Sequence, residues 1–355
     1  MYFASDNWAG AHPKVAEAVL RDNAGNRPAY GLSDDDRQLD VLFSDIFETK
    51  VSVFLVSTGT AANALALSAM AKPGAVLFCH DEAHVRVDEC GAPLFFAPGM
   101  QLQGVSGAVG KIDINALHAA VETVRGGGLN AGRPGGLSLT QATESGTVYT
   151  LDEISAHTAL MKSHGLHTHL DGARFANALR ALQCTPADMT WRQGIDVLSF
   201  GGTKNGCWCA EAIIVFNQDL ARDMHFLRKR SGHLVSKMRF MTSQFKAYLA
   251  DDLWLELADK ANAQAAKLRQ AVRHSNHARL AWDSAINEAF IAADEKTIAA
   301  WRNAGLRASD WQVPVAEQQE LLIPGQKIIR LVTSFATTDA EIDAFTQLIA
   351  TLTKQ

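Results

Sequence analysis

A lysine in a glycine-rich turn is the residue of this chain best suited to covalent chemistry. Lys204 lies in SFGGTKNGCWC (199–209), between the strand-like runs IDVLSF and AEAIIVF. Removing an ammonium group from water is costly, so a lysine between two buried strands needs a partner or a function. The chemical option is a Schiff base between its amine and a carbonyl group. The structural option is an ion pair at the edge of the sheet.

Three other polar features accompany this lysine. STGTAAN (57–63) is a strand end, a turn and a helix start, which either holds a phosphate or is an ordinary junction. Asp171 in HLDGAR either caps the next helix or holds a proton on a ring nitrogen. His84 in HDEAH is a satisfied polar residue, or it lies flat on a conjugated ring or takes up a proton.

Taken together, these features match the requirements of one cofactor. Pyridoxal phosphate needs a cradle for its phosphate, a lysine for its aldehyde and an acid near its pyridine nitrogen. That acid keeps the ring protonated, so the ring can accept electrons from a breaking bond at the Cα of an amino acid. The turn near 58, the acid near 171 and the lysine near 204 form a more specific pattern than any one of them alone.

Alternating strands and helices are expected to position these groups. Such alternation is typical of a parallel sheet covered on both faces, whose sites lie at the carboxyl ends of the strands. The unusual residues fall at those ends. The hydrophobic patterns predict helices at 13–24, 34–48, 60–71, 151–163 and 173–182, and strands at 51–57, 75–79, 134–140, 166–170, 196–200 and 211–216.

The pattern changes after about residue 230. Residues 233–252 and 253–274 resemble two long helices, and residues 287–352 resemble a small α/β layer. A chain of 355 residues is longer than one compact core usually holds. We therefore predict a large domain at 1–245, with its N-terminal segment near the site, and a small C-terminal domain at 246–355.

Composition narrows the class of protein. The chain is 47% hydrophobic and 20% charged with a net charge of −5, and it has no long basic run, so nucleic acid is not favoured as a partner. No apolar stretch is long enough to predict a membrane span, and MYFASDNWAG does not resemble a secretory signal, so a cytoplasmic location is expected. Five cysteines argue against a disulfide framework, and Cys207 and Cys209 lack the two-residue spacing common in zinc sites, so no metal is predicted.

The chain resembles the L-threonine aldolases, pyridoxal-phosphate enzymes of the β-eliminating lyase group with the aspartate aminotransferase-like fold, fold type I. The resemblance extends from residue 3 to 343 and rests on SDN near the start, AYG, STGTAAN, EAH, HLDGAR, GGTKNG and IRLVT. The length and GGTKNG are closer to the phenylserine aldolase-like branch. The resemblance implies a large, mostly parallel sheet domain and a smaller C-terminal α/β domain.

The implied reaction cleaves L-threonine, L-allo-threonine or a related β-hydroxy-α-amino acid such as phenylserine into glycine and an aldehyde. The nearest alternative is a β-elimination by another lyase of the same fold. A transaminase, and a cofactor-binding protein that has lost activity, are further alternatives.

The resemblance also implies which residues hold the cofactor. Lys204 would carry it in a Schiff base, Asp171 would pair with the pyridine nitrogen, and His84 would stack on the ring. Gly59 and Thr60 would hold the phosphate.

The substrate carboxylate would be held by Ser5, Arg174 and Arg330, and Arg174 would also contact the cofactor. Taken alone, each arginine could equally form an ordinary ion pair. Many members have Glu-Asn-Thr-His where this chain has TQATE (140–144), so Thr143 stands in place of a histidine credited with handling the substrate hydroxyl. His84, a water or the cofactor phosphate remain as proton acceptors.

The family forms dimers or tetramers with shared sites, which implies a homodimer or homotetramer here. The segment FLRKRSGHLVSKMRF (226–240) is rich in cations. It is either a solvated helix face or the source of a cation, Arg230 or Arg239, for a neighbour's phosphate.

Overall fold

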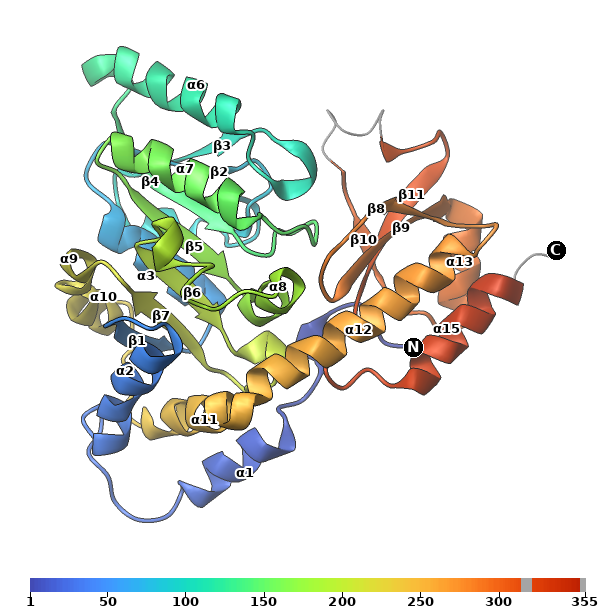
Figure 1. Cartoon of the computed structure of the whole chain (residues 1–355), viewed down its shortest axis with the longest axis horizontal. Coiled ribbons are helices and arrows are strands. Elements are labelled where there is room, and N and C mark those ends of the chain that lie inside the picture. Colours follow the sequence, from blue (N-terminus) through green and yellow to red (C-terminus); the bar gives the residue numbers. More distant parts are fainter. Residues whose placement is uncertain (314–320, 352–355) are drawn as a thin grey trace.

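A seven-stranded sheet forms the centre of the larger part of the molecule (Figure 1). The computed structural model describes residues 1–313 and 321–351. The strands are β1 (Ser52–Val56), β2 (Ala75–His80), β3 (Gln101–Val105), β4 (Arg133–Thr140), β5 (His167–Gly172), β6 (Val197–Gly201) and β7 (Glu211–Val215). Their order is β1-β7-β6-β5-β4-β2-β3, and every neighbouring pair is parallel except the two that involve β7. The predicted α/β fold with a mostly parallel sheet is confirmed.

The strand predicted at 211–216 is β7, which runs antiparallel to both of its neighbours in a sheet that is otherwise parallel. Only residues 202–210 connect β6 to β7, and a parallel return needs a crossover of a dozen or more residues. The chain therefore turns back beside β6, with Gly201 paired to Glu211. The turn that carries Lys204 is the loop of this hairpin.

Helices cover both faces of the sheet. They are α1 (Pro13–Arg21), α2 (Asp34–Ile46), α3 (Gly59–Met70), α4 (His84–Val87), α5 (Ala92–Phe96), α6 (Ile114–Gly126), α7 (Leu151–Ser163), α8 (Phe175–Leu182), α9 (Gln218–Ala221), α10 (Met224–Arg230) and α11 (Arg239–Leu249). On one face α2, α6, α7, α8 and α11 pack against the apolar side chains of the strands. On the other face α3, α5, α9 and α10 do so.

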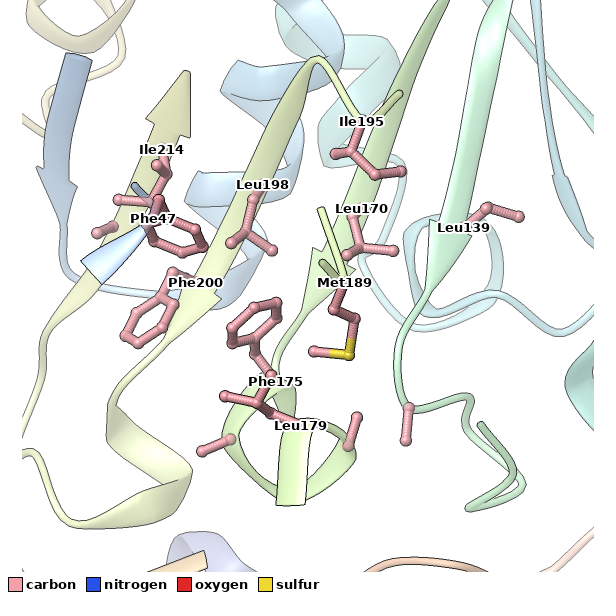
Figure 2. Close-up of a cluster of buried hydrophobic side chains, with 14 of the residues drawn as sticks. Phe47, Leu139, Leu170, Phe175, Leu179, Met189, Ile195, Leu198, Phe200 and Ile214 are labelled. Carbon is pink, nitrogen blue, oxygen red and sulfur yellow. The ribbon is translucent and has the colours of Figure 1, made fainter. Parts of the chain in front are cut away.

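Aromatic side chains fill the core on the first of these faces. The ring of Phe200, on β6, has its centroid 5.5 Å from those of Phe43 and Phe175 and 6.0 Å from that of Phe245. Figure 2 shows Phe200 and Phe175 beside Leu198 in this cluster. Because close-packed interiors resist deformation, this core holds the carboxyl ends of the neighbouring strands rigidly.

The starts of the helices follow from local capping chemistry. Ser33 and Asp36 exchange hydrogen bonds at the start of α2, where each side chain accepts from the other's backbone N–H. Thr58 Oγ1 accepts a hydrogen bond from the Ala61 N–H, 3.1 Å away, at the start of α3. This cap serves only the third helical residue, so the first two N–H groups of α3 remain available.

A second, antiparallel sheet forms the smaller part of the molecule. It contains β8 (Arg279–Trp282), β9 (Glu288–Asp294), β10 (Ser309–Trp311) and β11 (Gln326–Val332) in the order β10-β11-β9-β8. The helices α12 (Leu253–Arg273), α13 (Glu295–Asn303) and α15 (Asp339–Thr351) accompany it. Figure 1 shows α12 running from the end of α11 to this sheet, and its two ends contribute to different apolar cores.

The N-terminus joins the small sheet before it reaches the large one. The Phe3 N–H donates to Arg307 O at 2.9 Å, and Phe3 O accepts from the Val332 N–H at 2.7 Å. The short 3₁₀ helix η1 (Asp6–Trp8) follows directly. The first residues are therefore fixed on the small sheet, and the next ones lie between the two sheets.

Several predicted boundaries shift. The helix predicted at 233–252 is confined to α11, because the preceding backbone bonds elsewhere: Ser236 O accepts from the Tyr30 N–H at 2.9 Å. The sequence did not predict α4, α5, α6 and β3. Residues 314–320 and 352–355 of the predicted small layer and domain lie outside the described residues. Within the described ranges no helix has both the length and the hydropathy needed to cross a membrane.

Candidate active site

A cavity of about 290 Å³ lies where the ends of β1, β5 and β6 meet the start of α3. Its volume is near the lower end of the range for small-molecule sites. The carboxyl ends of parallel strands are the usual position of such sites. The residues predicted for the site that line it are Gly59, Thr60, His84, Asp171, Arg174 and Lys204.

Lys204 lies in a single 3₁₀ turn, η5 (Thr203–Asn205), between β6 and β7. Its amine makes no hydrogen bond or ion pair with any residue that the structure describes. Burial lowers the pKa of Lys204, and the charge of Arg174 acts in the same direction, against nearby carboxylates. A lowered pKa leaves more of the amine neutral, which is the nucleophilic form.

Asn205 and Glu211 fix the loop around this lysine. Asn205 Nδ2 donates to the hydroxyl oxygen of Tyr248 at 2.7 Å and to the carbonyl oxygen of Trp254 at 2.8 Å. The carboxylate of Glu211 accepts hydrogen bonds from two backbone N–H groups of the loop, at 3.1 and 3.3 Å. Burial raises the pKa of Glu211 to about 7. The lysine backbone is thus tied to α11, to the start of α12 and to β7.

Asp171 ends β5 and is 2% exposed. Its Oδ1 accepts a hydrogen bond from the Ala173 N–H at 3.0 Å, and its Oδ2 accepts one from Asn63 Nδ2 at 2.7 Å. One oxygen therefore orders the turn before α8, while the carboxylate also lines the cavity. The two options left open by the sequence, a local structural role and a role toward a ligand, are compatible.

The start of α3 lines the same cavity. The N–H groups of Gly59 and Thr60 make no hydrogen bond within the described residues. A Cβ added to Gly59 would meet no atom within 4 Å. Open space at the positive end of a helix suits an anionic group such as a phosphate. Ser57 also lines the cavity, with Oγ 3.4 Å from Nδ1 of His233.

His84, at the start of α4, is held by two acidic residues. Its Nδ1 lies 2.8 Å from Oε1 of Glu89, and its backbone N–H donates to Oε1 of Glu144 at 2.7 Å. The hydrogen bond with Glu89 raises the pKa of His84, although burial opposes this. His84 lines the cavity between these partners.

Arg174 and Arg330 meet at one buried carboxylate. Arg174 donates to both oxygens of Asp6, at 2.9 and 3.2 Å, and its Nη2 lies 3.4 Å from Oε1 of Glu288. The same oxygen lies 3.5 Å from Arg330 Nη1. Burial acts against the charged form of Arg174, but these carboxylates outweigh it and raise its pKa. Arg330 does not line the cavity, and its guanidinium carbon lies 5.0 Å from the ring centroid of Trp311.

Ser5 also lies outside the main cavity. Its Oγ accepts a hydrogen bond from the Asn7 N–H at 3.1 Å and caps η1, and its side chain lines a separate depression with Tyr2 and Trp8. Asn7, which the sequence did not single out, lines the main cavity. Asn7 is therefore the residue of the SDN motif that lines the main cavity.

Glu144 enters the cavity where the sequence drew attention to Thr143. Thr143 is fully buried, and its hydroxyl lies 2.8 Å from that of Thr147. Glu144 lines the cavity, and burial raises its pKa to about 7. The sequence offered one sign that could have identified Glu144, because it is the only ionisable residue of TQATE.

The two candidate cations for a neighbour's phosphate differ in their surroundings. Arg239 donates to the carbonyl oxygens of Gly25 and Asn23, at 2.9 and 3.4 Å. Arg230 is exposed. Cys207 is buried and Cys209 exposed, and the described residues contain no group of three or more His, Cys, Asp or Glu that could hold a metal.

The fold and the cavity together fit the fold type I class of pyridoxal-phosphate enzymes. A buried lysine amine, an acid and a helix start converge at the carboxyl ends of the strands. The beta-eliminating lyase family matches residues 2–295. A low specificity L-threonine aldolase of Pseudomonas aeruginosa is 41% identical over 305 residues, which cover 86% of this chain and 88% of that one. The chain belongs to this family, among the L-threonine aldolases, whose members depend on pyridoxal phosphate.

Solved structures agree with this assignment. The threonine aldolase of Leishmania major has a TM-score of 0.90 and 29% identity, and the match covers 98% of each chain. The methionine aminotransferase YbdL of Escherichia coli has a TM-score of 0.73 at 13% identity, which shows the fold alone. One fold thus supports different reactions, and the reaction must be argued from the site.

Proposed function

We propose that this chain cleaves the Cα–Cβ bond of L-threonine, L-allo-threonine or a related β-hydroxy-α-amino acid to give glycine and an aldehyde. The observation that carries the proposal is the amine of Lys204, which has no ion pair among the described residues and shares one cavity with Asp171 and the start of α3. Membership of the L-threonine aldolases supports it. A β-elimination by the same site is the alternative.

The residues of the cavity suit pyridoxal phosphate. Lys204 would hold the aldehyde carbon, Asp171 the ring nitrogen, and Gly59 and Thr60 the phosphate, with His84 against the ring. The cofactor, when bound, supplies an electron sink for the bond that breaks at Cα. The carboxylate of Asp171 favours the protonated ring nitrogen and thereby strengthens that sink.

The substrate would be oriented through its carboxylate. Arg174 lines the cavity, Arg330 would join it from the small sheet, and Ser5 would add a hydroxyl. Paired guanidinium contacts give direction as well as energy. They would hold the substrate in one orientation in the cavity, and orientation of this kind contributes roughly 7–11 kcal/mol in favourable cases.

We propose that His84 is the general base that accepts the proton of the β-hydroxyl group. Glu144 also lines the cavity, but both of its oxygens are less suited to this role. Its Oε1 accepts a hydrogen bond from the backbone N–H of His84, and its Oε2 is buried without a hydrogen-bond partner among the described residues. The Nε2 atom of His84 makes no hydrogen bond among the described residues, and the side chain lines the cavity. A general base must lie within reach of the proton that it removes.

The central test concerns Lys204. Purified protein with pyridoxal phosphate is incubated with L-threonine, L-allo-threonine and phenylserine, and glycine and the aldehydes are measured. Borohydride reduction followed by peptide mapping should place the cofactor on Lys204. Lys204→Ala should abolish turnover, because the amine that holds the aldehyde is gone. Lys111→Ala serves as the control, since that lysine pairs with Glu153. Cofactor trapped on another lysine would refute the assignment.

The products separate the aldolase from its rival. Glycine and an aldehyde result from Cα–Cβ cleavage, whereas a 2-oxo acid and ammonia result from loss of the β-substituent. A 2-oxo acid as the main product would favour the alternative.

The same proposal extends to assembly and location. We propose a homodimer or homotetramer with Arg230 as the cation offered to a neighbour, supported by exposed apolar residues on and near α2, including Tyr30, Leu32 and Val41. Five free cysteines support a cytoplasmic location. We also propose that the domains divide near residue 245, where α11 leads toward α12.

A further inference from the structure

One buried amide joins two carboxylates beside the cavity. Asn63, on α3, is 3% exposed. Its Nδ2 donates to Oδ2 of Asp171 at 2.7 Å and to Oε1 of Glu89 at 2.8 Å. An amide nitrogen carries two hydrogens, so each carboxylate receives one of them. Glu89 is thereby fixed at a defined position relative to Asp171.

Glu89 in turn holds His84. Oε1 of Glu89 lies 2.8 Å from Nδ1 of His84. An ionised carboxylate carries no hydrogen and can only accept, so Oε1 of ionised Glu89 accepts both from Asn63 and from an N–H at Nδ1 of His84. A neutral imidazole with its hydrogen on Nδ1 has an acceptor at Nε2. Nε2 makes no hydrogen bond among the described residues, so in this form it is the ring nitrogen that can accept a proton.

We propose that Glu89, fixed by Asn63, is a positioning residue that holds His84 with its hydrogen on Nδ1 and joins it to Asp171 in one network. Because a role for His84 in the reaction rests on the proposed function, the inference deepens that function. Glu89 does not line the cavity. Its effect on the reaction therefore passes through His84.

A purely structural role explains the network poorly. Oε2 of Glu89 and Oδ1 of Asn63 are buried without a hydrogen-bond partner in the described structure. A buried polar atom without a partner destabilises the fold by about 1–3 kcal/mol. Apolar residues of similar size would avoid that loss. Unsatisfied buried groups call for an explanation, and a set orientation of His84 provides one.

The charges around His84 favour its protonated form. It is faced by Glu89, by Asp171 at the end of β5, by Glu144 after β4, and by the cation Lys204 in η5. The hydrogen bond that His84 donates to Glu89 makes the largest contribution to the raised pKa of His84, while burial and Lys204 lower it. Removing the charge of Glu89 should therefore make His84 release its proton at a lower pH.

The first test follows the imidazole of His84 by nitrogen NMR in cofactor-free protein labelled with ¹⁵N-histidine, with His84→Asn to identify its signals among the 12 histidines. The wild type should show the Nδ1–H form. Glu89→Gln, which keeps the shape and an acceptor oxygen, should lower the titration midpoint of His84 by about 1–3 pH units. Glu89→Asp, which keeps the charge, should recover part of the difference.

A matched control exists elsewhere in the chain. Asp196 Oδ1 lies 3.3 Å from Nδ1 of His167 and raises the pKa of that histidine. Asp196→Asn should lower the titration midpoint of His167 and leave that of His84 in place. An Nε2–H form of His84 in the wild type, or an unchanged midpoint in Glu89→Gln, overturns the inference.

The second test uses the loaded enzyme. In Glu89→Gln the acidic limb of the kcat profile should move to lower pH in parallel with the NMR midpoint. An acidic limb that stays in place while the midpoint moves also overturns the inference. These outcomes are distinguishable from failure of the proposed function, in which the wild type itself yields no glycine from any β-hydroxy amino acid.

Discussion

Single side chains in the cavity are held by partners from distant parts of the chain, and several of these partners are acids. Burial raises the pKa of Glu144 to about 7 and also raises that of Glu89, despite the hydrogen bonds that Glu89 accepts from His84 and Asn63. A raised pKa means that the folded protein favours the protonated form of the carboxyl group more strongly than the unfolded chain does. At the residue scale, then, stability should depend on pH through these acids.

Glu144→Gln tests this dependence. Glu144 has a folded pKa above its unfolded value, so the stability that it contributes is fully present below about pH 4.5 and is lost as the pH rises through about 7. The free energy of unfolding of cofactor-free Glu144→Gln, relative to that of the wild type, should therefore increase by on the order of 2 kcal/mol between pH 5 and pH 8. Thermal unfolding of both proteins at pH 5 and at pH 8 measures this difference in stability.

The control for this comparison is Glu122→Gln. Glu122 lies on the surface and its pKa is lowered by a hydrogen bond from Arg125, so this variant should show no such gain. A difference between wild type and Glu144→Gln that is the same at pH 5 and pH 8 would contradict the assignment.

Among the elements, the hairpin β6–β7 does most to place the amine of Lys204. Its loop is bonded at one end to Glu211 on β7 and in its middle, through Asn205, to Tyr248 of α11 and Trp254 of α12. These partners come from three elements, so the position of Lys204 depends on how they pack. The position of the amine that we propose as reactive is in this sense a property of the packing.

Asn205→Ala should loosen this loop. It leaves the Tyr248 hydroxyl and the Trp254 carbonyl without their donor, which should destabilise the protein by about 1–3 kcal/mol and weaken cofactor binding. Calorimetry and a pyridoxal phosphate titration measure the two effects. Asn177→Ala is the matched control, because Asn177 is equally buried but bonds to Asn262 on α12. Equal cofactor affinity in the two variants would show that Asn205 does not position the lysine.

On the scale of the whole molecule, the two sheets meet at Glu288. This carboxylate starts β9 and lies between Arg174, just before α8, and Arg330, on β11. Asn287 adds a contact, since its Nδ2 donates to Oδ2 of Asp6 at 3.1 Å. The carboxylate-binding arginines of the proposed function are thus brought together from both parts of the chain.

Arg330→Ala should weaken capture of the substrate more than its conversion. Loss of a charged hydrogen bond of about 1.5–3 kcal/mol should raise KM for threonine roughly 10- to 100-fold, with a smaller fall in kcat. Arg279→Ala is the control: Arg279 lies in the same sheet and bonds to Gln326. An unchanged KM in Arg330→Ala would exclude it from the carboxylate site.

Local patterns in the sequence were enough to single out three groups that the structure brings to one cavity. Lys204, Asp171 and the start of α3 follow directly from strand ends, glycine turns and capping residues, and hydrophobic periodicity predicted most elements of the large sheet. These features depend on neighbours a few residues away. The length of a connection is also visible in the sequence. Only nine residues connect β6 to β7, which is too short for a parallel crossover and therefore indicates an antiparallel β7.

By itself, the sequence determined the α/β class of this protein and singled out the lysine that we propose as its reactive residue, because both depend on chemistry and spacing within short segments. Tertiary structure alone decided that Asn63 meets Asp171, 108 residues away, and that Arg174 meets Asp6, 168 residues away. It also decided that Glu144 rather than Thr143 reaches the cavity. Such contacts arise from packing between distant elements, and no pattern within one segment specifies which side chain will be enclosed beside which.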